Sequence, residues 1–267
     1  FNFSYMFQYN DINIYEKGNR AYNTTYKYHL AEFGFSDVWY KNFRFGLGLR
    51  FEYYKYKDFL FKQPELIDLK VESEHFLSYF AQIHYNTYDK GYFPAKGSDF
   101  KAAYSLYTDN MAQYNEHAPF SALSASWASV LPITRRFSVI PSIYGRILIG
   151  RNFPYPLQNA IGGEVPGFYI PQQLPFAGVN NIELMDNAIM IASLKFRQRM
   201  GAIHYLILTG NYGLTDSHFF KILKGKQLFG ISAGYGMDSV FGPLEISLGY
   251  SNQTDKASCF VNLGYYF

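Results

Sequence analysis

The last eleven residues, Ala257 to Phe267, read A-S-C-F-V-N-L-G-Y-Y-F and decide the fold. Every second residue back from the carboxyl end is apolar or aromatic: Phe267, Tyr265, Leu263, Val261, Cys259 and Ala257. The residues between them are mostly small or polar. Side chains of a strand point alternately to its two faces, so one face suits hydrocarbon and the other a wet interior. Because a lone strand would leave its backbone groups unpaired in a bilayer, the stretch predicts a closed barrel of further strands.

The composition fits a membrane barrel. The chain has 26 Tyr and 26 Phe in 267 residues, and these rings favour strands and membrane interfaces. No apolar run approaches about 18 residues, which excludes a transmembrane helix. The net charge of +3 is too small to predict a nucleic-acid partner. The one cysteine, Cys259, excludes an intrachain disulfide and is expected to act as a small hydrophobe on the lipid face. Phe1 begins mid-pattern without a signal peptide, so we expect a mature, trimmed or partial chain.

The pattern predicts an all-β fold, a transmembrane antiparallel β-barrel with about twelve strands in this chain. In the expected third strand, every second residue from Phe43 to Tyr53 is apolar or aromatic. The residues between them include Arg44, Arg50 and Glu52, so the opposite face of the strand indicates a polar interior. The expected strands are Phe1–Tyr9, Ala21–Ser36, Asn42–Lys57, Glu74–Thr87, Gly97–Asp109, Phe120–Leu131, Phe137–Gly150, Asn187–Arg199, Ala202–Gly213, Gln227–Met237, Pro243–Ser251 and Ala257–Phe267.

The connections between these strands alternate between long and short. The expected long ones are Asn10–Arg20, Asp58–Ser73, Asn110–Pro119, Arg151–Asp186 and Leu214–Lys226, whereas the brief Asn252–Lys256 breaks the pattern. This alternation is typical of barrels in the bacterial outer membrane, with short periplasmic turns and longer outside loops. We therefore expect one outer-membrane barrel domain over residues 1–267. Arg151–Asp186 is too long for a passive loop, which predicts a function for it.

Two further stretches resemble a known family. Asn86–Gly97, N-T-Y-D-K-G-Y-F-P-A-K-G, resembles a turn of the BamA-like superfamily of outer-membrane assembly and secretion barrels (the bacterial surface antigen type). Phe241–Tyr250, F-G-P-L-E-I-S-L-G-Y, resembles the penultimate strand of that superfamily, and the terminal L-G-Y-Y-F its last strand. Members usually have sixteen strands, so the resemblance also allows this chain to be the C-terminal part of a 16-stranded barrel.

The resemblance implies that residues 151–186 fold into the lumen. The candidate residues of this lumenal loop are Gly178, Asn181 and Glu183. The sequence departs from the family motif V-R-G-Y/F here, because Glu183 falls near the expected arginine and Leu184 near the glycine. The departure favours a divergent branch, such as the barrels fused to patatin-like phospholipases.

The function implied by the resemblance is that of a translocator or membrane anchor for an N-terminal domain absent from this chain, either a patatin-like passenger or periplasmic repeats. An outer-membrane protein assembly factor and a passive porin-like channel are the alternatives. Gly264 and Phe267 of the last strand, with Gly249 of its neighbour, are expected at a weakly paired seam. The partners expected are outer-membrane lipid and lipopolysaccharide, the barrel-assembly machinery through the C-terminal strand, and a passenger domain.

Charged residues on the inner face form the remaining candidate site. They are expected either as a salt-bridge network that rigidifies the barrel or as contacts for the loop, with Glu183 facing Arg146 or Arg197. The predicted lumenal charges are Arg44, Arg50, Glu52, Arg146 and Arg197, together with Lys195, Arg199 and Glu245.

Motifs of enzymatic chemistry are missing from the sequence. It has no G-x-S-x-G nucleophile elbow and no H-E-x-x-H metal helix. The six histidines are scattered over separate strands and loops. We therefore expect no catalytic residues, metal or cofactor in this chain, although a fused patatin-like lipase upstream would be compatible with it.

Overall fold

Twelve long strands form the body of the part of the molecule that the structure describes. The computed structural model describes residues 1–61, 73–110, 114 and 118–264. Each expected strand is present, with bounds that differ by a few residues at most ends. The long strands are β1 (Asn2–Glu16), β2 (Asn19–Tyr40), β3 (Phe43–Phe61), β4 (Glu74–Asn86), β5 (Gly97–Tyr107), β6 (Phe120–Pro132), β7 (Phe137–Ile149), β11 (Ala188–Arg199), β12 (His204–Asp216), β13 (Lys226–Ser239), β14 (Gly242–Ser251) and β15 (Lys256–Leu263).

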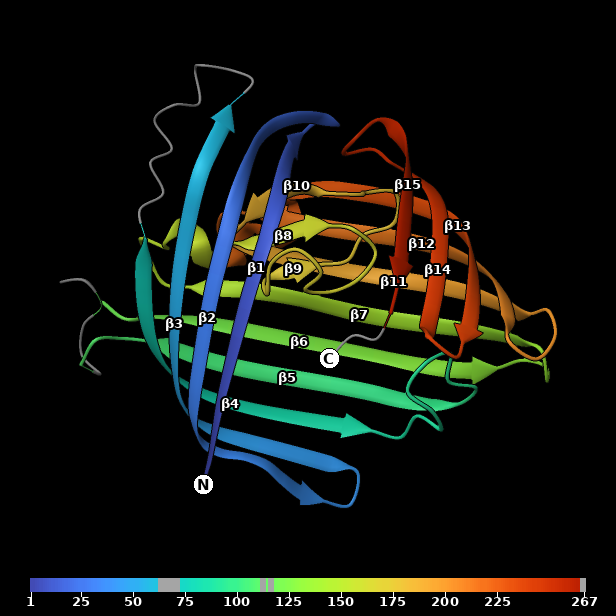
Figure 1. The fold of residues 1–267 in the computed structure, drawn as a ribbon, viewed down its shortest axis with the longest axis horizontal. Helices are drawn as coiled ribbons and strands as arrows, with labels where there is room; N and C mark the ends of the chain where they lie inside the picture. The colour runs from blue at the N-terminus through green and yellow to red at the C-terminus, as the bar shows by residue number, and fades with distance from the viewer. Residues whose placement is uncertain (62–72, 111–113, 115–117, 265–267) are drawn as a thin grey trace.

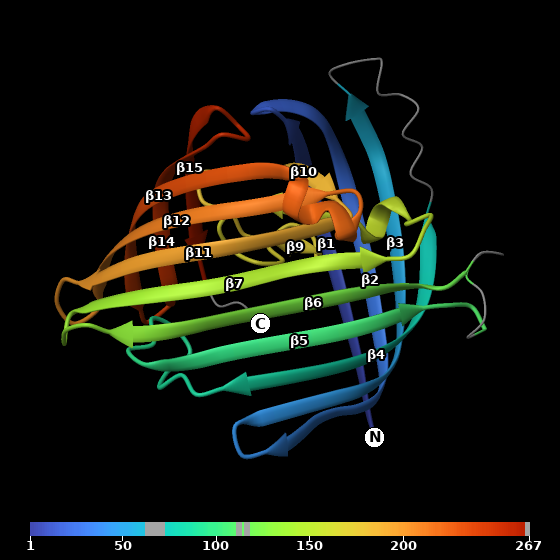
Figure 2. The ribbon, with the colours of Figure 1, turned by 180° about the vertical axis from the view of Figure 1, so that it is seen from behind.

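The long strands pair antiparallel with their neighbours in one strongly curved sheet (Figures 1 and 2). The sheet runs from β15 to β11, continues through β7 to β1, and ends in three short strands from the connection between β7 and β11. The expected all-β, largely antiparallel fold is therefore confirmed. Within the described residues, β1 and β15 are not neighbours in the sheet. The start of β15 contacts the β1–β2 turn and the start of β2, where Lys256 Nζ donates to Gly18 O at 3.1 Å and to Asn19 Oδ1 at 2.8 Å.

The two faces of the sheet differ as the alternation predicts. On β15, Val261 and Leu263 are 55% and 66% exposed, whereas Phe260 and Asn262 are 4% and 3% exposed. The outer face therefore carries a broad apolar surface, and the inner face carries the packed and polar residues. Cys259 lies on the exposed face. A helix both long and apolar enough to span a membrane does not occur in the described part of the chain.

The expected loop Asn10–Arg20 was wrong, because β1 continues to Glu16 and only Lys17 and Gly18 form the turn. Asn and Asp in this stretch were interpreted as turn signals. Ile12 and Ile14 are 2% and 8% exposed, however, and their burial inside the sheet stabilises an extended strand. The connections around residues 62–72 and 111–117 lie largely outside the described residues.

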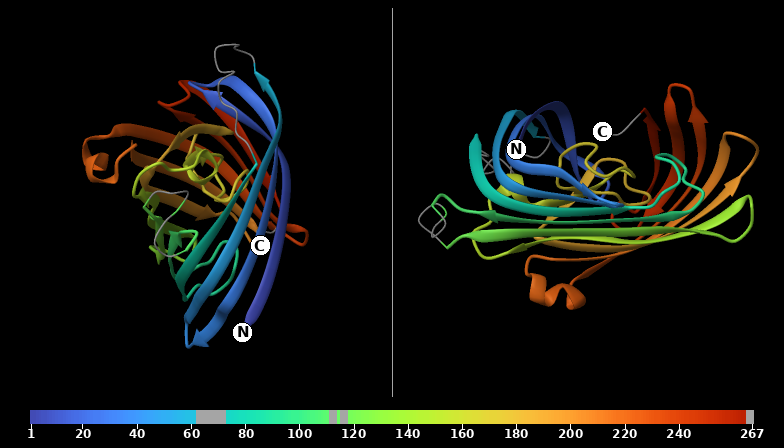
Figure 3. Two further views of the ribbon diagram at one scale, coloured as in Figure 1. Left: turned by 90° about the vertical axis from the view of Figure 1, so that its left-hand side faces the viewer. Right: turned by 90° about the horizontal axis from the view of Figure 1, so that it is seen from below.

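The connection between β7 and β11 lies inside the curved sheet (Figures 1 and 3). It contains the 3₁₀ helix η2 (Tyr155–Leu157) and the strands β8 (Asn159–Gly162), β9 (Gln173–Leu174) and β10 (Ile182–Asp186). One apolar cluster joins its Leu157, Ala160, Ile170 and Ile182 to the tyrosines of β2 and β3. A second joins Ile161, Phe176 and Val179 to β11 and β13. Residues 151–186, hereafter the plug, therefore contact both walls of the lumen.

Candidate functional site

A buried carboxylate organises the inner wall on the side of β2 to β5. Glu52 is 5% exposed and accepts three tyrosine hydroxyl hydrogen bonds. Tyr28 and Tyr54 donate to its Oε1 at 2.9 Å each, and Tyr107 donates to its Oε2 at 3.0 Å. Hydrogen bonds to an ionised acceptor are stronger than neutral ones, so this cluster fixes the three rings in place. The rings are the surface on which the plug rests.

The plug binds the tyrosine cluster directly. Gln172 Nε2 donates to the hydroxyl of Tyr54 at 2.7 Å and to Pro156 O at 2.9 Å. The hydroxyls of Tyr22 and Tyr155 are hydrogen-bonded to each other. Tyr54 therefore connects Glu52 of the wall to Gln172 of the plug by consecutive hydrogen bonds.

Arg50 and Arg44, two of the predicted lumenal charges, lie on the same wall. Arg50 Nε donates to Glu32 Oε1 at 2.8 Å, and its guanidinium lies 4.7 Å from the ring centre of Phe80. The Arg44 guanidinium lies 5.8 Å from the Trp39 ring. A cavity of about 710 Å³ separates this wall from the plug, and Arg44, Arg50, Glu52 and Arg146 all line it. The structure thus brings four of the five predicted lumenal charges to one cavity.

Arg146 ties the plug to β7. Its Nη1 donates to Leu157 O at 2.7 Å and also to Asn159 Oδ1. Asn159 Nδ2 in turn donates to Arg146 O and Asn187 O, at 2.8 Å each. Asn159 is fully buried, so these exchanges satisfy an amide that would otherwise be costly to bury. The sequence did not single out Asn159.

Three glycines allow the plug to lie against the opposite wall. Gly178 has a φ of +76°, and a Cβ there would lie 2.3 Å from the Tyr250 carbonyl carbon. A Cβ on Gly249 would lie 2.7 Å from Gly178 Cα, and one on Gly230 would lie 2.2 Å from Ala177 O. Gly249 is regularly paired with Ser258 of β15, and it marks a close approach of the plug to β14.

Polar contacts secure the plug on the same wall. The Ala177 amide donates to Asn211 Oδ1 at 2.7 Å, and Tyr144 donates its hydroxyl to Pro175 O at 2.8 Å. Ser232 Oγ donates to Glu164 Oε2 at 3.1 Å. Residues from β7, β12 and β13 therefore hold one side of the plug.

Glu183 lies near the seam and not beside an arginine. Its carboxylate accepts a hydrogen bond from the Gly18 amide in the β1–β2 turn. Arg146 donates instead to Leu157 O, and Arg197 donates to Pro94 O. Burial raises the pKa of this carboxyl to about 7. The expected pairing failed because the position of the plug along the lumen cannot be read from strand alternation. Asn181 contributes its carbonyl, which lies against Gly162.

The seam itself is partly filled by the plug. Ile182 of β10 is the parallel partner of Ile14 in β1, so the plug takes a place at the β1 edge. Gly264 follows β15 with a φ of +117°, and its amide donates to Pro243 O at 3.1 Å. Phe267 lies outside the described residues.

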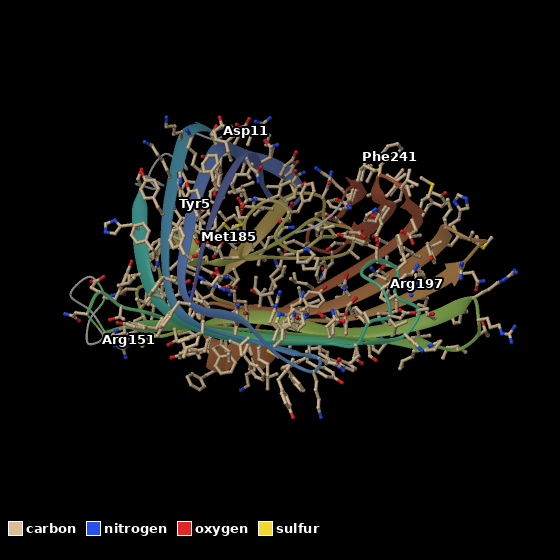
Figure 4. All side chains as sticks on the ribbon, turned by 60° about the horizontal axis from the view of Figure 1, so that its bottom comes forward. Tyr5, Asp11, Arg151, Met185, Arg197 and Phe241 are labelled. Atoms are coloured by element: carbon tan, nitrogen blue, oxygen red, sulfur yellow. The ribbon has the colours of Figure 1, made fainter. Side chains whose placement is uncertain are left out.

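Arg197 lies at the opposite end of the lumen, beside the turn between β4 and β5 (Figure 4). Its Nη2 donates to Pro94 O, and its guanidinium lies 5.7 Å from the Tyr205 ring centre. Phe93 has a φ of +46°, is 6% exposed and stacks on Tyr205 with ring centres 4.4 Å apart. The N-T-Y-D-K-G-Y-F-P turn therefore folds over this mouth, and its Phe-Pro step supplies the contact.

Comparison with known proteins agrees with this architecture. The sequence model of the OMP85 superfamily matches residues 1–267. The fold is similar to BamA from Haemophilus ducreyi lacking POTRA domains 1-3, with a TM-score of 0.69, 13% identity, and coverage of 98% of this chain and 58% of that one. It is also similar to CdiB from Escherichia coli, with a TM-score of 0.58, 13% identity, and coverage of 93% and 45%. The chain thus spans about half the length of these proteins. No curated protein matches it.

Proposed function

The chain belongs to the OMP85 superfamily, whose barrels lie in the bacterial outer membrane, and we propose on that premise that it is a polypeptide translocator gated by the plug. In this proposal a passenger segment passes when residues 151–186 leave their place between the walls. The passenger is a domain joined to the barrel, of the patatin-like type or another. No covalent chemistry is required of the barrel.

The observation that carries the proposal is the place of β10 on the β1 edge. Ile182 pairs with Ile14, so the plug uses a strand edge that a closed barrel would give to β15. An unpaired strand edge is a template for another extended chain. A plug held there by one parallel bridge and side-chain contacts can leave without breaking the long antiparallel ladders of the wall.

The packing of the plug sets how readily it moves. Leu157, Ile161, Phe176 and Ile182 are at most 1% exposed, and burying each such side chain contributes about 1.5–3 kcal/mol. The plug is therefore stably docked at rest, which argues against a passive porin. Its release needs a competing polypeptide that replaces some of these contacts.

A reversible lock tests the proposal. Ile14→Cys and Ile182→Cys, in a Cys259→Ser background, join the plug to β1 by a disulfide across paired Cα positions. A tagged passenger fused to the chain is expected to reach the cell surface when the two thiols are reduced. It is expected not to reach the cell surface when they are oxidised to the disulfide. The matched control is Ser98→Cys with Ser129→Cys, whose Oγ atoms lie 2.9 Å apart in the wall, away from the plug.

Equal export with the plug locked and unlocked would refute gating. A passenger that is held at the membrane but not exported, whatever the redox state, would indicate an anchor. A large steady current through the locked protein in a planar bilayer would indicate a porin.

Assembly of other barrels is a second candidate, favoured by the edges of β1 and β15. Both long edges are without a long partner strand in the described structure. Insertion of a reporter barrel into liposomes containing this protein tests it. If the locked plug blocks insertion while passenger export is absent throughout, the assembly function is the correct one.

A further inference from the structure

The 3₁₀ helix η3 (Phe219–Lys224) lies on the outer face of the barrel, at the end where the plug enters (Figures 2 and 3). Ile222 is 4% exposed and packs with Ile147 and Ala188. Ile147 belongs to the outward stripe of β7, whose Ile143 and Ile149 are exposed. The helix is therefore fastened onto the membrane-facing wall.

Two large apolar side chains of η3 point away from that wall. Phe220 is 92% exposed and Leu223 is 80% exposed. Lys221 and Lys224, both exposed, alternate with them along the helix. Exposed apolar groups that continue a lipid-facing surface and carry lysines beside them are typical of a contact with the boundary between acyl chains and anionic headgroups.

A groove of about 490 Å³ lies on the same outer wall, on the side of η3 toward the middle of the barrel. Its floor is Gly210, where a Cβ would have no neighbour within 4 Å. Its sides are apolar and include Leu194, Tyr212, Phe229 and Ile231. Gly210, Tyr212 and Leu214 follow one another along the outward face of β12, and Leu214 packs against the cluster that holds η3. The floor of the groove at Gly210 therefore lies about 13 Å from Leu214.

We propose that η3 and this groove bind one lipid of the outer leaflet, a phosphorylated and multiply acylated glycolipid of the lipid A type. The phosphates contact Lys221 and Lys224, and one acyl chain fills the groove over Gly210. Phe220 and Leu223 insert between the neighbouring chains. The inference rests on the outer-membrane location of the family and is independent of what the plug does.

The choice of lipid A follows from the side of the membrane and from charge. Within the described chain, the plug and the β12–β13 connection lie at the same end of the strands, and the β2–β3, β11–β12 and β13–β14 turns at the other end are short. Longer connections face outward in such barrels. In the outer leaflet the anionic, multiply acylated lipid is the one whose chemistry fits two lysines above an acyl groove.

Binding of purified lipid A to the whole chain in detergent micelles tests the site, with native mass spectrometry as readout. Lys221→Gln with Lys224→Gln is expected to weaken binding about 25-fold, the effect of two lysines at an anionic surface. Gly210→Leu is expected to lower the number of bound lipids while leaving the fold intact, because its side chain enters empty space.

Matched controls separate the site from general effects. Arg135→Gln with Arg136→Gln removes two charges at the opposite end of the strands, and Ala233→Leu places the same side chain elsewhere on the outer wall. Both are expected to bind as the unmodified chain does. Heat-modifiable migration in gels verifies that each variant is folded.

Three outcomes would overturn the inference. The first is equal loss of binding in the lysine pair and the arginine pair. The second is unchanged binding by Gly210→Leu. The third is equal affinity for lipid A, for its dephosphorylated form and for phosphatidylglycerol. Failure of passenger export would leave all of these measurements unaffected, so the two proposals fail separately.

Discussion

The Glu52 carboxylate offers the sharpest test of how the lumen is held together. Glu52→Ala removes the acceptor of the Tyr28, Tyr54 and Tyr107 hydroxyls, all at most 2% exposed. A buried polar group that loses its partner costs about 1–3 kcal/mol. Three such losses would cost about 3–9 kcal/mol. Because Tyr54 keeps its contact with Gln172, we expect a fall of about 2–6 kcal/mol in the free energy of unfolding.

Urea unfolding of the refolded barrel in lipid vesicles, followed by tryptophan fluorescence, measures this change. Glu52→Gln retains an acceptor oxygen and is expected to lose only about a third of that amount, since its bonds are no longer to a charge. Glu245→Ala is the control, because this inner-face glutamate accepts no side-chain hydrogen bond within the described residues. A loss for Glu52→Ala no larger than that for Glu245→Ala would refute the role of the tyrosine cluster.

Three further predictions concern the plug and the turn at the other mouth. Gly178→Ala is expected to undock the plug and raise bilayer conductance, because the new Cβ would overlap the backbone of β14. Gly167→Ala is the control, because Gly167 has a similar φ of +68° and empty space where the Cβ would lie. The pKa of Glu183 is raised from about 4.5 to about 7 in the docked plug, so docking is strongest below pH 4.5 and weakens as the pH rises through 7. Conductance should therefore rise from pH 5 to pH 8, and Glu183→Gln should flatten the rise; a flat profile in the unmodified chain would contradict this. Arg197→Ala is expected to expose the turn between β4 and β5 to protease, because Arg197 donates to Pro94 O in that turn. Arg199→Ala should leave the turn protected, because the Arg199 side chain donates only to carbonyls of the β11–β12 turn.

The strands could be predicted from the sequence because lipid and lumen impose opposite demands on alternate residues. Each of the twelve expected strands is present, and the residues of β15 alternate between exposed and buried as the pattern requires. The error at Asn10–Arg20 shows the limit of this reasoning. Asn and Asp are turn signals only where nothing packs on their neighbours, and Ile12 and Ile14 are covered by the plug cluster.

The plug contacts were not predictable in the same way. The sequence indicated that residues 151–186 carry a function and that Arg44, Arg50, Glu52 and Arg146 face inward, and the structure brings these four to one cavity. Gly230 and Gly249 gave no signal for a contact with the plug, because a glycine in a strand pattern indicates either weak pairing or a close approach. Only the position of a second backbone decides between the two.

What the sequence determined by itself is which side of each strand meets lipid, because that depends on a residue's parity along its own strand and on nothing distant. The tertiary structure alone decided what the inner sides contact. Glu183 meets Gly18, Gly178 meets Tyr250 and Ile182 pairs with Ile14, each across more than 70 residues of chain. Such contacts depend on how an irregular segment settles against a curved wall, and no local periodicity encodes that position.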